Sequence, residues 1–372
     1  MATVYKNFNG SDVVHTRTLL HEAIPVTGSI VSGTYGGNGV VLGSEPHIKK
    51  YAHGMFESVF DYPFLSSSAN HIFDITAGYS SVSELSGATN TQNAKKIAVY
   101  NQMAQVLAGY DHAGNIRRFD EDGNLASGTK LDEVFFINFS RLLTKDEIKK
   151  GTFQLDLGVD AAFSQNTTVM TEVINITDAS GSNGYYVNSP AGEYGILYAT
   201  NSAGPDILKS HNSFPVGLIY YQAGIAVLSA SVFNDNVQGG IINDDSGSCA
   251  LYGLEGTPVG FQEFTGSTIP ATADGIRNRV KNIQFDNTTE LNSAIHFCRV
   301  NHNEYNYSAN PTYLTGSKIK VKGNNRKNLP VSYITSVGLY SADRELLAVA
   351  KLSEPLKKDP TMELTLKVRL DY

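Results

Sequence analysis

The clearest pattern of hydrophobic and polar positions is found near the C-terminal end of the chain. Over residues 363–372 apolar and polar residues alternate strictly, and the apolar positions are Leu364, Leu366, Val368 and Leu370. A period of two is typical of a half-buried antiparallel strand with one face toward water. Two further strands are predicted at residues 333–340 and 346–352. We therefore expect the chain to end in a β-meander.

Two apolar stripes with helical spacing occur in the first part of the chain. In residues 46–63, apolar side chains recur every three or four positions, at Ile48, Tyr51, Met55 and Val59. The same spacing occurs in residues 93–108, where Gly109 follows as a helix stop. Both segments are predicted to be helices.

Shorter signals complete this first region. Thr144 and Glu147 have the spacing of a capping box, which predicts a short helix that ends at Lys150. Residues 133–139 and 153–157 have the composition of strands, and a strand is also expected at residues 29–31. The first 158 residues are therefore expected to form an α+β region.

The middle of the chain is expected to be mostly β. Residues 216–221 and 225–233 flank a turn that contains Gly224, which favours a hairpin. The Gly-rich residues 239–273 are predicted to be a long loop. The remaining strand predictions are residues 185–187, 195–198 and 293–300.

Together these patterns predict an α+β fold that is predominantly antiparallel β, with its short helices near the N-terminus. Three regions are expected: an α+β region at 1–158, a β-rich region with long loops at 159–292, and an antiparallel β region at 293–372.

Composition limits the classes of partner. The net charge is −7 and the sequence pI is about 5.7, which does not favour nucleic-acid binding. One basic stretch at residues 318–327 is interpreted as a solvated face. No apolar stretch reaches the roughly 20 residues of a spanning helix, so no membrane span is expected. The N-terminus has no apolar leader, and synthesis in a reducing cytoplasm is expected.

The sequence offers one weak candidate for metal binding. On a strand His296 and Cys298 would share a face, and His302 could return from a turn. A tetrahedral site needs a fourth ligand, which the spacing does not provide. A buried cysteine beside surface histidines is the favoured interpretation. We expect no metal, cofactor or catalytic residue, and therefore no enzyme.

Several segments carry a resemblance to a known family. They are residues 60–74, 100–107, 303–313, 333–340, 346–352 and 368–372. These segments resemble virion structural proteins of large contractile-tailed bacteriophages, including those that infect cyanobacteria. The resemblance implies a tail component in the virion, and a wedge-type baseplate protein is the first choice. A neck or fibre-attachment subunit is the alternative within the same family.

The resemblance also implies partners, namely other tail or baseplate proteins and copies of this chain. The 20 Tyr and 17 Phe suit interface cores. Lys367 and Arg369, on the predicted wet face of the last strand, are the candidate interface residues. Two rival functions are a receptor- or glycan-binding module of the same particle and a metal-dependent enzyme. The absence of Trp counts mildly against sugar binding, although Tyr could replace it.

Overall fold

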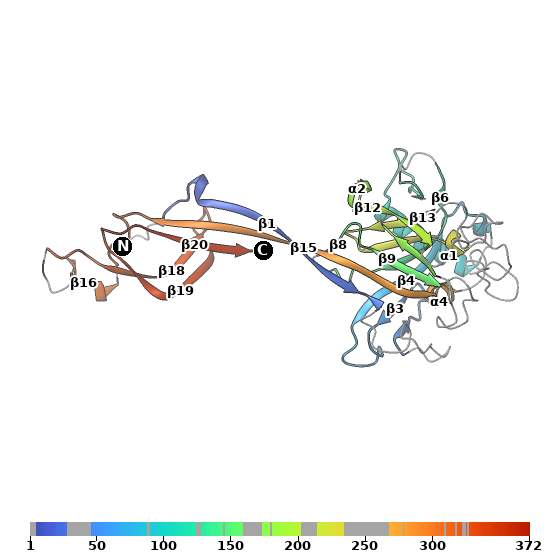
Figure 1. The fold of residues 1–372 in the computed structure, drawn as a ribbon, viewed down its shortest axis with the longest axis horizontal. Coiled ribbons are helices and arrows are strands. Elements are labelled where there is room, and N and C mark those ends of the chain that lie inside the picture. The colour runs from blue at the N-terminus through green and yellow to red at the C-terminus, as the bar shows by residue number, and fades with distance from the viewer. Residues whose placement is uncertain are drawn as a thin grey trace. The chain divides into compact units, whose positions relative to one another are not determined.

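The computed structural model describes most of the chain. The described residues are 5–27, 46–87, 90–123, 128–143, 146–158, 173–178, 181–201, 214–233, 268–277, 279–308, 310–316, 318–321, 325 and 327–372. The chain divides into two compact units (Figure 1). Unit 1 comprises Met1–Leu19 and Glu290–Tyr372, and unit 2 comprises Leu20–Thr289. The division falls within two long strands, β1 (Val13–Pro25) and β15 (Val280–Val300).

Unit 2 is built on one large antiparallel sheet. Its hydrogen-bonded order runs β15-β9-β10-β12-β13-β14-β7-β4-β3-β2, while β11 pairs with β12 and β8 pairs with β15. The strands are β2 (Ile48–Lys50), β3 (Glu57–Phe60), β4 (His71–Tyr79), β7 (Glu133–Asn138), β8 (Glu147–Ile148), β9 (Gln154–Gly158), β10 (Val173–Thr177), β11 (Tyr186–Ser189), β12 (Gly192–Asn201), β13 (Phe214–Tyr220) and β14 (Ile225–Ser229). A small separate pair is formed by β5 (Phe119–Asp120) and β6 (Lys130–Leu131).

The central strands of this sheet are buried on both faces. In β7, Phe135 and Ile137 belong to one hydrophobic cluster, whereas Val134 and Phe136 belong to the cluster on the opposite face. This double burial explains why the strand is a continuous apolar run instead of an alternating one. The strand predicted at residues 133–139 is therefore confirmed in the middle of the sheet.

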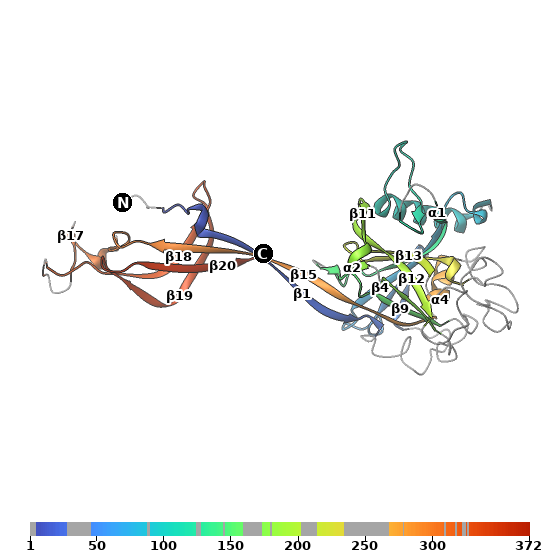
Figure 2. The same cartoon turned by 45° about the horizontal axis from the view of Figure 1, so that its top comes forward.

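One face of the sheet is covered by α1 (Thr91–Leu107), the helix predicted at residues 93–108 (Figure 2). Asn90 caps its N-terminus by accepting a hydrogen bond from the Asn93 backbone N–H at 2.8 Å. The helix backbone lies very close to β4 at Gly78. A Cβ on Gly78 would come within 2.7 Å of the Lys96 carbonyl oxygen. A glycine is needed here because two backbones meet.

The other face of the sheet encloses the larger cluster. The Phe139 ring lies 5.9 Å from Phe73 of β4 and 5.4 Å from Phe285 of β15, measured between centroids. Phe153 adds a third ring at 6.0 Å. Because these rings come from strands that are far apart in the hydrogen-bonded order, the sheet must curl around this cluster.

The hairpin predicted in the middle region is confirmed. β13 and β14 pair in register from Gly217 opposite Leu228 to Tyr220 opposite Ile225. Gly224 in the connecting turn has a φ of +65°, which favours glycine. The strand predicted at residues 185–187 overlaps β11, and the strand predicted at residues 195–198 lies within β12.

The predicted helix at residues 46–63 is wrong. The chain instead forms β2 and β3, and Ile48 and Val59, two members of the helical stripe, are opposite each other in the antiparallel register. Gly54 has a φ of +63° and donates a backbone hydrogen bond to Tyr51 at 2.9 Å, which makes a turn. The apolar positions at spacings of three and four therefore belong to two strands and the turn between them, not to one face of a helix.

The short helix predicted after Thr144 is also wrong. Residues 144 and 145 lie outside the described residues, and the following residues form β8, which pairs with β15. The backbone N–H groups of Ile148 and Lys149 donate to Tyr221 and Asp286, at 3.1 and 2.8 Å. These tertiary hydrogen bonds replace the local bonds that a helix would need.

The predicted loop at residues 239–273 lies mostly outside the described residues, but its end is helical. α4 (Ile269–Arg277) begins there, with Pro270 in its first turn, and a further short helix is α2 (Gly181–Gly184). Pro270 had favoured a loop, although proline suits a first helical turn. The strand predicted at residues 29–31 lies outside the described residues.

The C-terminal part of unit 1 contains three antiparallel strand pairs among the described residues. β18 (Ser332–Tyr340) and β19 (Leu346–Lys358) form an antiparallel hairpin, and β16 (Leu314–Thr315) pairs with β17 (Lys318–Ile319). β20 (Leu364–Asp371) pairs with β15, from Ser293 opposite Asp371 to Val300 opposite Leu364. The three predicted C-terminal strands exist, but the last strand joins β15 instead of continuing the meander from β19.

The alternation predicted for the last strand is confirmed. Its apolar residues are buried or half-buried, and its polar residues are exposed. The apolar face of β20 is shared with the directly opposite residues of β15, which include His296 and Cys298. The predominantly antiparallel β, α+β class is thus the observed one.

The observed units divide the chain differently from the three predicted regions. β9 and β10, on either side of residue 159, pair with each other in unit 2. The compact unit therefore continues across that boundary. The other predicted boundary, between 292 and 293, lies near the observed division at Thr289. Unit 1 also takes in residues from the N-terminus.

Candidate functional site

The two units differ in where their large apolar side chains lie. Among the described residues, unit 1 has only four buried apolar side chains, Ala294, Val300, Leu339 and Val368. It has fifteen exposed large apolar side chains, against eight in the longer unit 2. Those of unit 1 are Tyr5, Phe8, Val14, Leu19, Tyr305, Tyr307, Ile319, Leu329, Tyr333, Tyr340, Leu346, Leu347, Val349, Met362 and Tyr372.

The outer face of the β18–β19 hairpin carries part of this apolar surface. Along β19, Ala348 and Ala350 are half-buried, whereas Leu347 and Val349 are 67 % and 53 % exposed. At the end of the hairpin, Tyr340 of β18 lies opposite Leu346 in the register, and both are also exposed. Exposed apolar side chains that lie close together in the chain and the register, instead of being scattered singly, are typical of an interaction surface.

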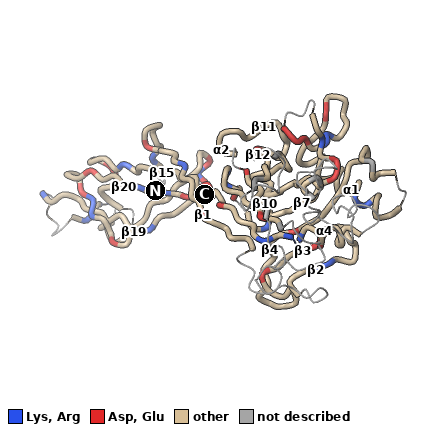
Figure 3. Tube along the Cα trace, turned by 45° about the vertical axis from the view of Figure 1, so that its right-hand side comes forward, with Lys and Arg blue, Asp and Glu red and all other residues tan. Residues whose placement is uncertain are grey.

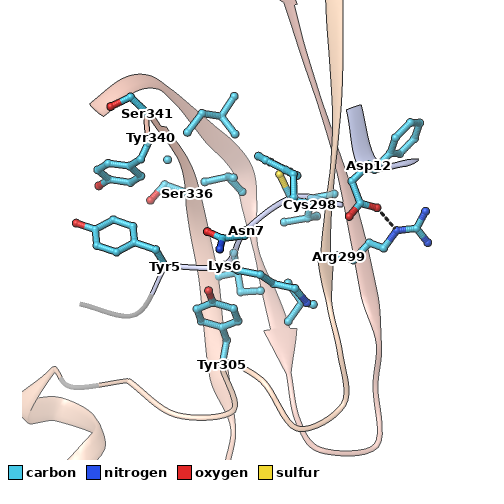
Figure 4. Close-up of a pocket in the computed structure, with 18 of the residues that line it drawn as sticks. Tyr5, Lys6, Asn7, Asp12, Cys298, Arg299, Tyr305, Ser336, Tyr340 and Ser341 are labelled. Atoms are coloured by element: carbon cyan, nitrogen blue, oxygen red, sulfur yellow. Dashed lines mark hydrogen bonds and ion pairs between the residues drawn. The ribbon is translucent and has the colours of Figure 1, made fainter. Parts of the chain in front are cut away.

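Unit 1 also contains a pocket of about 800 Å³. Its walls come from the N-terminal segment at residues 5–8, the end of β15, the hairpin residues 334–342 and the turn that contains Arg344. In Figure 4 the three tyrosines, Tyr5, Tyr305 and Tyr340, lie toward one side of the pocket, and the paired Asp12 and Arg299 lie toward the other.

A group of aromatic rings and one guanidinium forms the tyrosine side of the pocket. The rings of Tyr5 and Tyr340 meet edge to face, with centroids 5.0 Å apart and an interplanar angle of 74°. The guanidinium carbon of Arg344 lies 5.7 Å from the centroid of the Tyr5 ring. This is a cation–π distance, and it orients the side chain. Arg344 contacts no carboxylate among the residues that the structure describes.

The other side of the pocket contains a buried carboxylate. Asp12, which is 5 % exposed, accepts hydrogen bonds from the Asn9 backbone N–H at 3.0 Å and from Arg299 Nε at 2.6 Å. These bonds hold the pKa of Asp12 below its usual range. Asp12 is therefore a charged anchor that fixes Arg299 at the pocket wall, while half of the Arg299 side chain remains exposed.

The segment that follows β15 is fixed by a second set of polar contacts. Lys6 forms an ion pair with Glu304 at 2.5 Å. Lys358 is completely buried, and its ammonium donates to the carbonyl oxygens of His302 and Asp359 and to Asn306 Oδ1, at 3.1, 2.8 and 2.6 Å. Three acceptors satisfy the three donors of an ammonium. The wall next to Tyr305 is therefore rigidly attached to β19.

Two of the three predicted metal ligands share one face of β15, and the third lies beyond the end of that strand. His296 and Cys298 share the inner face of β15, as expected, and Cys298 lines the pocket. The His296 ring contacts Phe8, with centroids 5.3 Å apart. His302 is exposed and lies 3.4 Å from Glu363. Among the described residues, no three His, Cys, Asp or Glu side chains are grouped so that they could hold a metal ion.

Cys298 is a free thiol, and Cys249 lies outside the described residues. Burial, and secondarily the charge of Asp12, raise the pKa of the Cys298 thiol above its usual value. A raised pKa keeps the sulfur protonated and unreactive at neutral pH.

The two candidate interface residues lie on the exposed face of β20. Lys367 is opposite Phe297 and points to solvent, as the wet-face prediction requires. Arg369 donates to Asp371 Oδ1 at 2.6 Å and to Ser293 Oγ at 3.1 Å. Arg369 is thus already occupied by local hydrogen bonds, whereas Lys367 is the more available of the two.

Unit 2 brings together serine, histidine and aspartate, but not as a nucleophilic triad. Ser58 Oγ donates to Asp74 Oδ1 at 2.5 Å, and His71 Nε2 lies 2.6 Å from the same oxygen. The carboxylate therefore sits between the hydroxyl and the imidazole, so the histidine is not placed to take the proton of the serine. Ser58 is also completely buried.

Charge is distributed without a dominant basic face. Figure 3 shows Lys and Arg interspersed with Asp and Glu along the described chain. Of the basic stretch at residues 318–327, Lys318 and Ile319 form the exposed strand β17, and residues 322–324 and 326 lie outside the described residues. In the described part of the chain no helix is long and apolar enough to cross a membrane.

Sequence reasoning identified Cys298 but missed the pocket that it lines. The pocket residues come from positions 5–12, 297–305 and 334–344 and from Leu366, which no spacing rule connects. A comparison with protein-family models, with curated proteins and with solved structures finds no match to this chain.

Proposed function

We propose that this chain is a structural subunit of a bacteriophage tail, and most simply a wedge-type baseplate component that acts by assembly with other virion proteins. The observation that carries the assembly role is the apolar surface of unit 1. The identity of the particle rests on a resemblance to virion structural proteins, which is carried by residues 60–74, 100–107, 303–313, 333–340, 346–352 and 368–372.

The apolar surface supports assembly for an energetic reason. Each Å² of apolar surface removed from water contributes roughly 25 cal/mol, so a unit that exposes many large apolar side chains is stabilised when a partner covers them. Unit 1 exposes fifteen and buries four. Unit 2, which has a core on both faces of its sheet, has no comparable need of a partner.

A paired substitution tests this proposal. Leu347→Asp and Val349→Asp place a charge on the outer face of the hairpin, and Leu65→Asp places one at an equally open position of unit 2, where Leu65 is 88 % exposed. All variants are expected to fold. The unit 1 variants are expected to lose association with tail proteins of the particle from which the chain comes, measured by co-purification and by incorporation into particles. The Leu65 variant is expected to assemble normally.

The result that would overturn the proposal is a purified chain that stays strictly monomeric and associates with no tail protein. Equal incorporation of the Leu347→Asp and Leu65→Asp variants would remove the hairpin face from the interface. A Lys367→Ala, Arg369→Ala double variant that folds but fails to enter particles would extend the interface to the exposed face of β20.

A neck or fibre-attachment subunit would use the same surface, and its distinction from a baseplate wedge is the position in the particle. Labelling of the chain in intact particles, by antibody against unit 2, separates these positions. A receptor- or glycan-binding role is the second candidate function, because the unit 1 pocket has the composition of a ligand site.

A further inference from the structure

The pocket of unit 1 has the size of a small-ligand site. Its volume of about 800 Å³ falls in the range of roughly 300–1,000 Å³ that such sites occupy. Its lining combines apolar residues of the sheet faces, such as Val337 and Leu366, with a limited set of polar groups. That mixture is typical of a site where apolar contact supplies affinity and a few polar groups supply orientation.

Backbone strain is concentrated at this pocket. Tyr305 and Arg344 are the only described residues other than glycine that have a positive φ, at +53° and +65°. Both line the pocket. A left-handed backbone at such residues costs of order 1 kcal/mol each, and it is found most often at sites where a side chain must be held in one place.

The turn around Arg344 shows how that position is maintained. Ser341 accepts backbone hydrogen bonds from Arg344 at 3.1 Å and, through its hydroxyl, from Glu345 at 3.1 Å. The turn therefore fixes Arg344, and the Tyr5 ring orients its guanidinium. Arg344 lines the pocket, and its guanidinium has no carboxylate partner among the described residues. A planar guanidinium in that state is suited to a carboxylate of a ligand.

The charge of the lining favours an anionic ligand. Lys6, Arg299 and Arg344 line the pocket, and two of them are paired, Lys6 with Glu304 and Arg299 with Asp12. Arg344 is therefore the cation of the lining that has no carboxylate partner among the described residues. One such cation gives this site an attraction for anions in a chain whose net charge is −7.

The neutral polar groups point to a ligand rich in hydroxyls. Three tyrosines, with two serines (Ser336 and Ser341) and the amide of Asn7, contribute donors and acceptors around the pocket. Tyrosine also offers an apolar ring, against which the C–H face of a sugar can pack. Such a lining complements a sugar ring better than a hydrocarbon or a metal ion.

We propose that this pocket binds an acidic saccharide, a sugar that carries a carboxylate, with Arg344 as the carboxylate ligand and Tyr5, Tyr305 and Tyr340 as the sugar-contacting rings. The proposal goes beyond assembly, and its failure would leave the assembly role intact. An acidic peptide would share the carboxylate. The concave shape and small-ligand volume favour the saccharide, whereas protein partners are met by broader surfaces.

The test uses the full chain and two matched probes, a trisaccharide of galacturonic acid and the neutral galactose trisaccharide, with binding measured by calorimetry and by NMR. The acidic probe is expected to bind at least about tenfold more tightly, and added salt is expected to weaken it. Arg344→Gln is expected to reduce its affinity by about tenfold and Tyr5→Ala by about fivefold.

The matched control is Lys351→Gln, which removes a positive charge from the same hairpin at an exposed position outside the pocket lining. Its affinity is expected to stay within about twofold of the unchanged chain. Circular dichroism confirms that each variant is folded, and Arg344→Lys serves as a second probe that keeps the charge but loses the fork.

Four results would overturn the proposal. The first is no binding of the acidic probe at about 10 mM, far weaker than a specific site. The second is equal affinity for the neutral probe, and the third is an Arg344→Gln variant that binds as well as the unchanged chain. The fourth is a triglutamate peptide that binds more tightly than the acidic saccharide, because it would assign the pocket to a peptide.

Discussion

Unit 1 and unit 2 are built from the same kind of antiparallel strand but place their apolar side chains in opposite ways. The strands of unit 2 are buried on both faces, by α1 on one side and by the curled sheet itself on the other. The strands of unit 1 bury one face only in part and expose large apolar residues on the other. Unit 2 therefore has an extensive hydrophobic core of its own, whereas unit 1 has an exposed apolar surface that is suited to a partner.

Removal of the last strand is the change that is expected to affect unit 1 most. Deletion of residues 364–372 takes away the partner of β15 over eight register positions and exposes the half-buried inner face of unit 1. Each buried aliphatic side chain contributes roughly 1.5–3 kcal/mol, against a net stability of about 5–15 kcal/mol for a domain. The truncated chain is expected to be insoluble or unfolded, measured by soluble yield and circular dichroism.

The controls for this deletion are single substitutions on the opposite face of the same strand. Lys367→Ala and Arg369→Ala are expected to change the free energy of unfolding by less than about 1 kcal/mol, because exposed ion pairs contribute little. A truncated chain that folds and assembles normally would contradict the role given to β20.

Matched alanine substitutions of one large apolar residue in each unit test the difference in burial between the units. Phe139 is completely buried and contacts three other rings, so Phe139→Ala is expected to lower the free energy of unfolding by about 3–5 kcal/mol. Leu347 is 67 % exposed, so Leu347→Ala is expected to change it by less than about 0.5 kcal/mol. Urea unfolding of both variants measures the difference, and equal losses would show that unit 1 has a core of its own.

A smaller and pH-dependent effect is expected at a buried carboxyl group of unit 2. Asp178 accepts hydrogen bonds from the backbone N–H groups of Gly151 and Phe153 and from the Tyr221 hydroxyl, at 2.7, 2.9 and 3.0 Å. Burial nevertheless raises its pKa to about 6. Because this exceeds the pKa of roughly 3.9 in an unfolded chain, the stabilising contribution is complete below about pH 4 and is lost as the pH rises through 6.

Asp178→Asn isolates this titration because an amide has no charge to gain. The difference in free energy of unfolding between the unchanged chain and the variant is expected to shrink by about 2–3 kcal/mol between acidic and neutral pH. Urea unfolding at several pH values measures that difference. A difference that stays constant with pH would mean that the three donors hold the pKa of Asp178 near its ordinary value.

Some of this structure could be predicted from the sequence because the signal was local. The alternation of the last strand, the helix at 93–108 and the glycine turn at Gly224 each depend on residues that are close in the chain. The same locality explains the failures. The stripe at residues 46–63 fits a helix until the turn at Gly54 is known, and β8 depends on hydrogen bonds that its segment donates to the carbonyl oxygens of Tyr221 and Asp286.

The candidate site was beyond sequence reasoning for a related reason. Cys298 was identified for its sulfur, yet its place in one pocket with Tyr5 and Arg344 follows from the pairing of β15 with β20 and from the turn of the hairpin. The positive φ of Arg344 has no sequence signature, since arginine rarely adopts it. A pocket formed by segments that lie far apart in the chain can be found only once the fold is known.

The central claim is that the apolar face of unit 1 is covered in the particle, and hydroxyl-radical footprinting tests it most directly. The reactive exposed side chains Tyr340, Leu347 and Val349 of unit 1 are compared with Leu65 and Tyr110 of unit 2, in the free chain and in intact tails. The account predicts strong labelling of both sets in the free chain and protection of the unit 1 set in the particle. Labelling of the unit 1 set that is equally strong in the particle would contradict it.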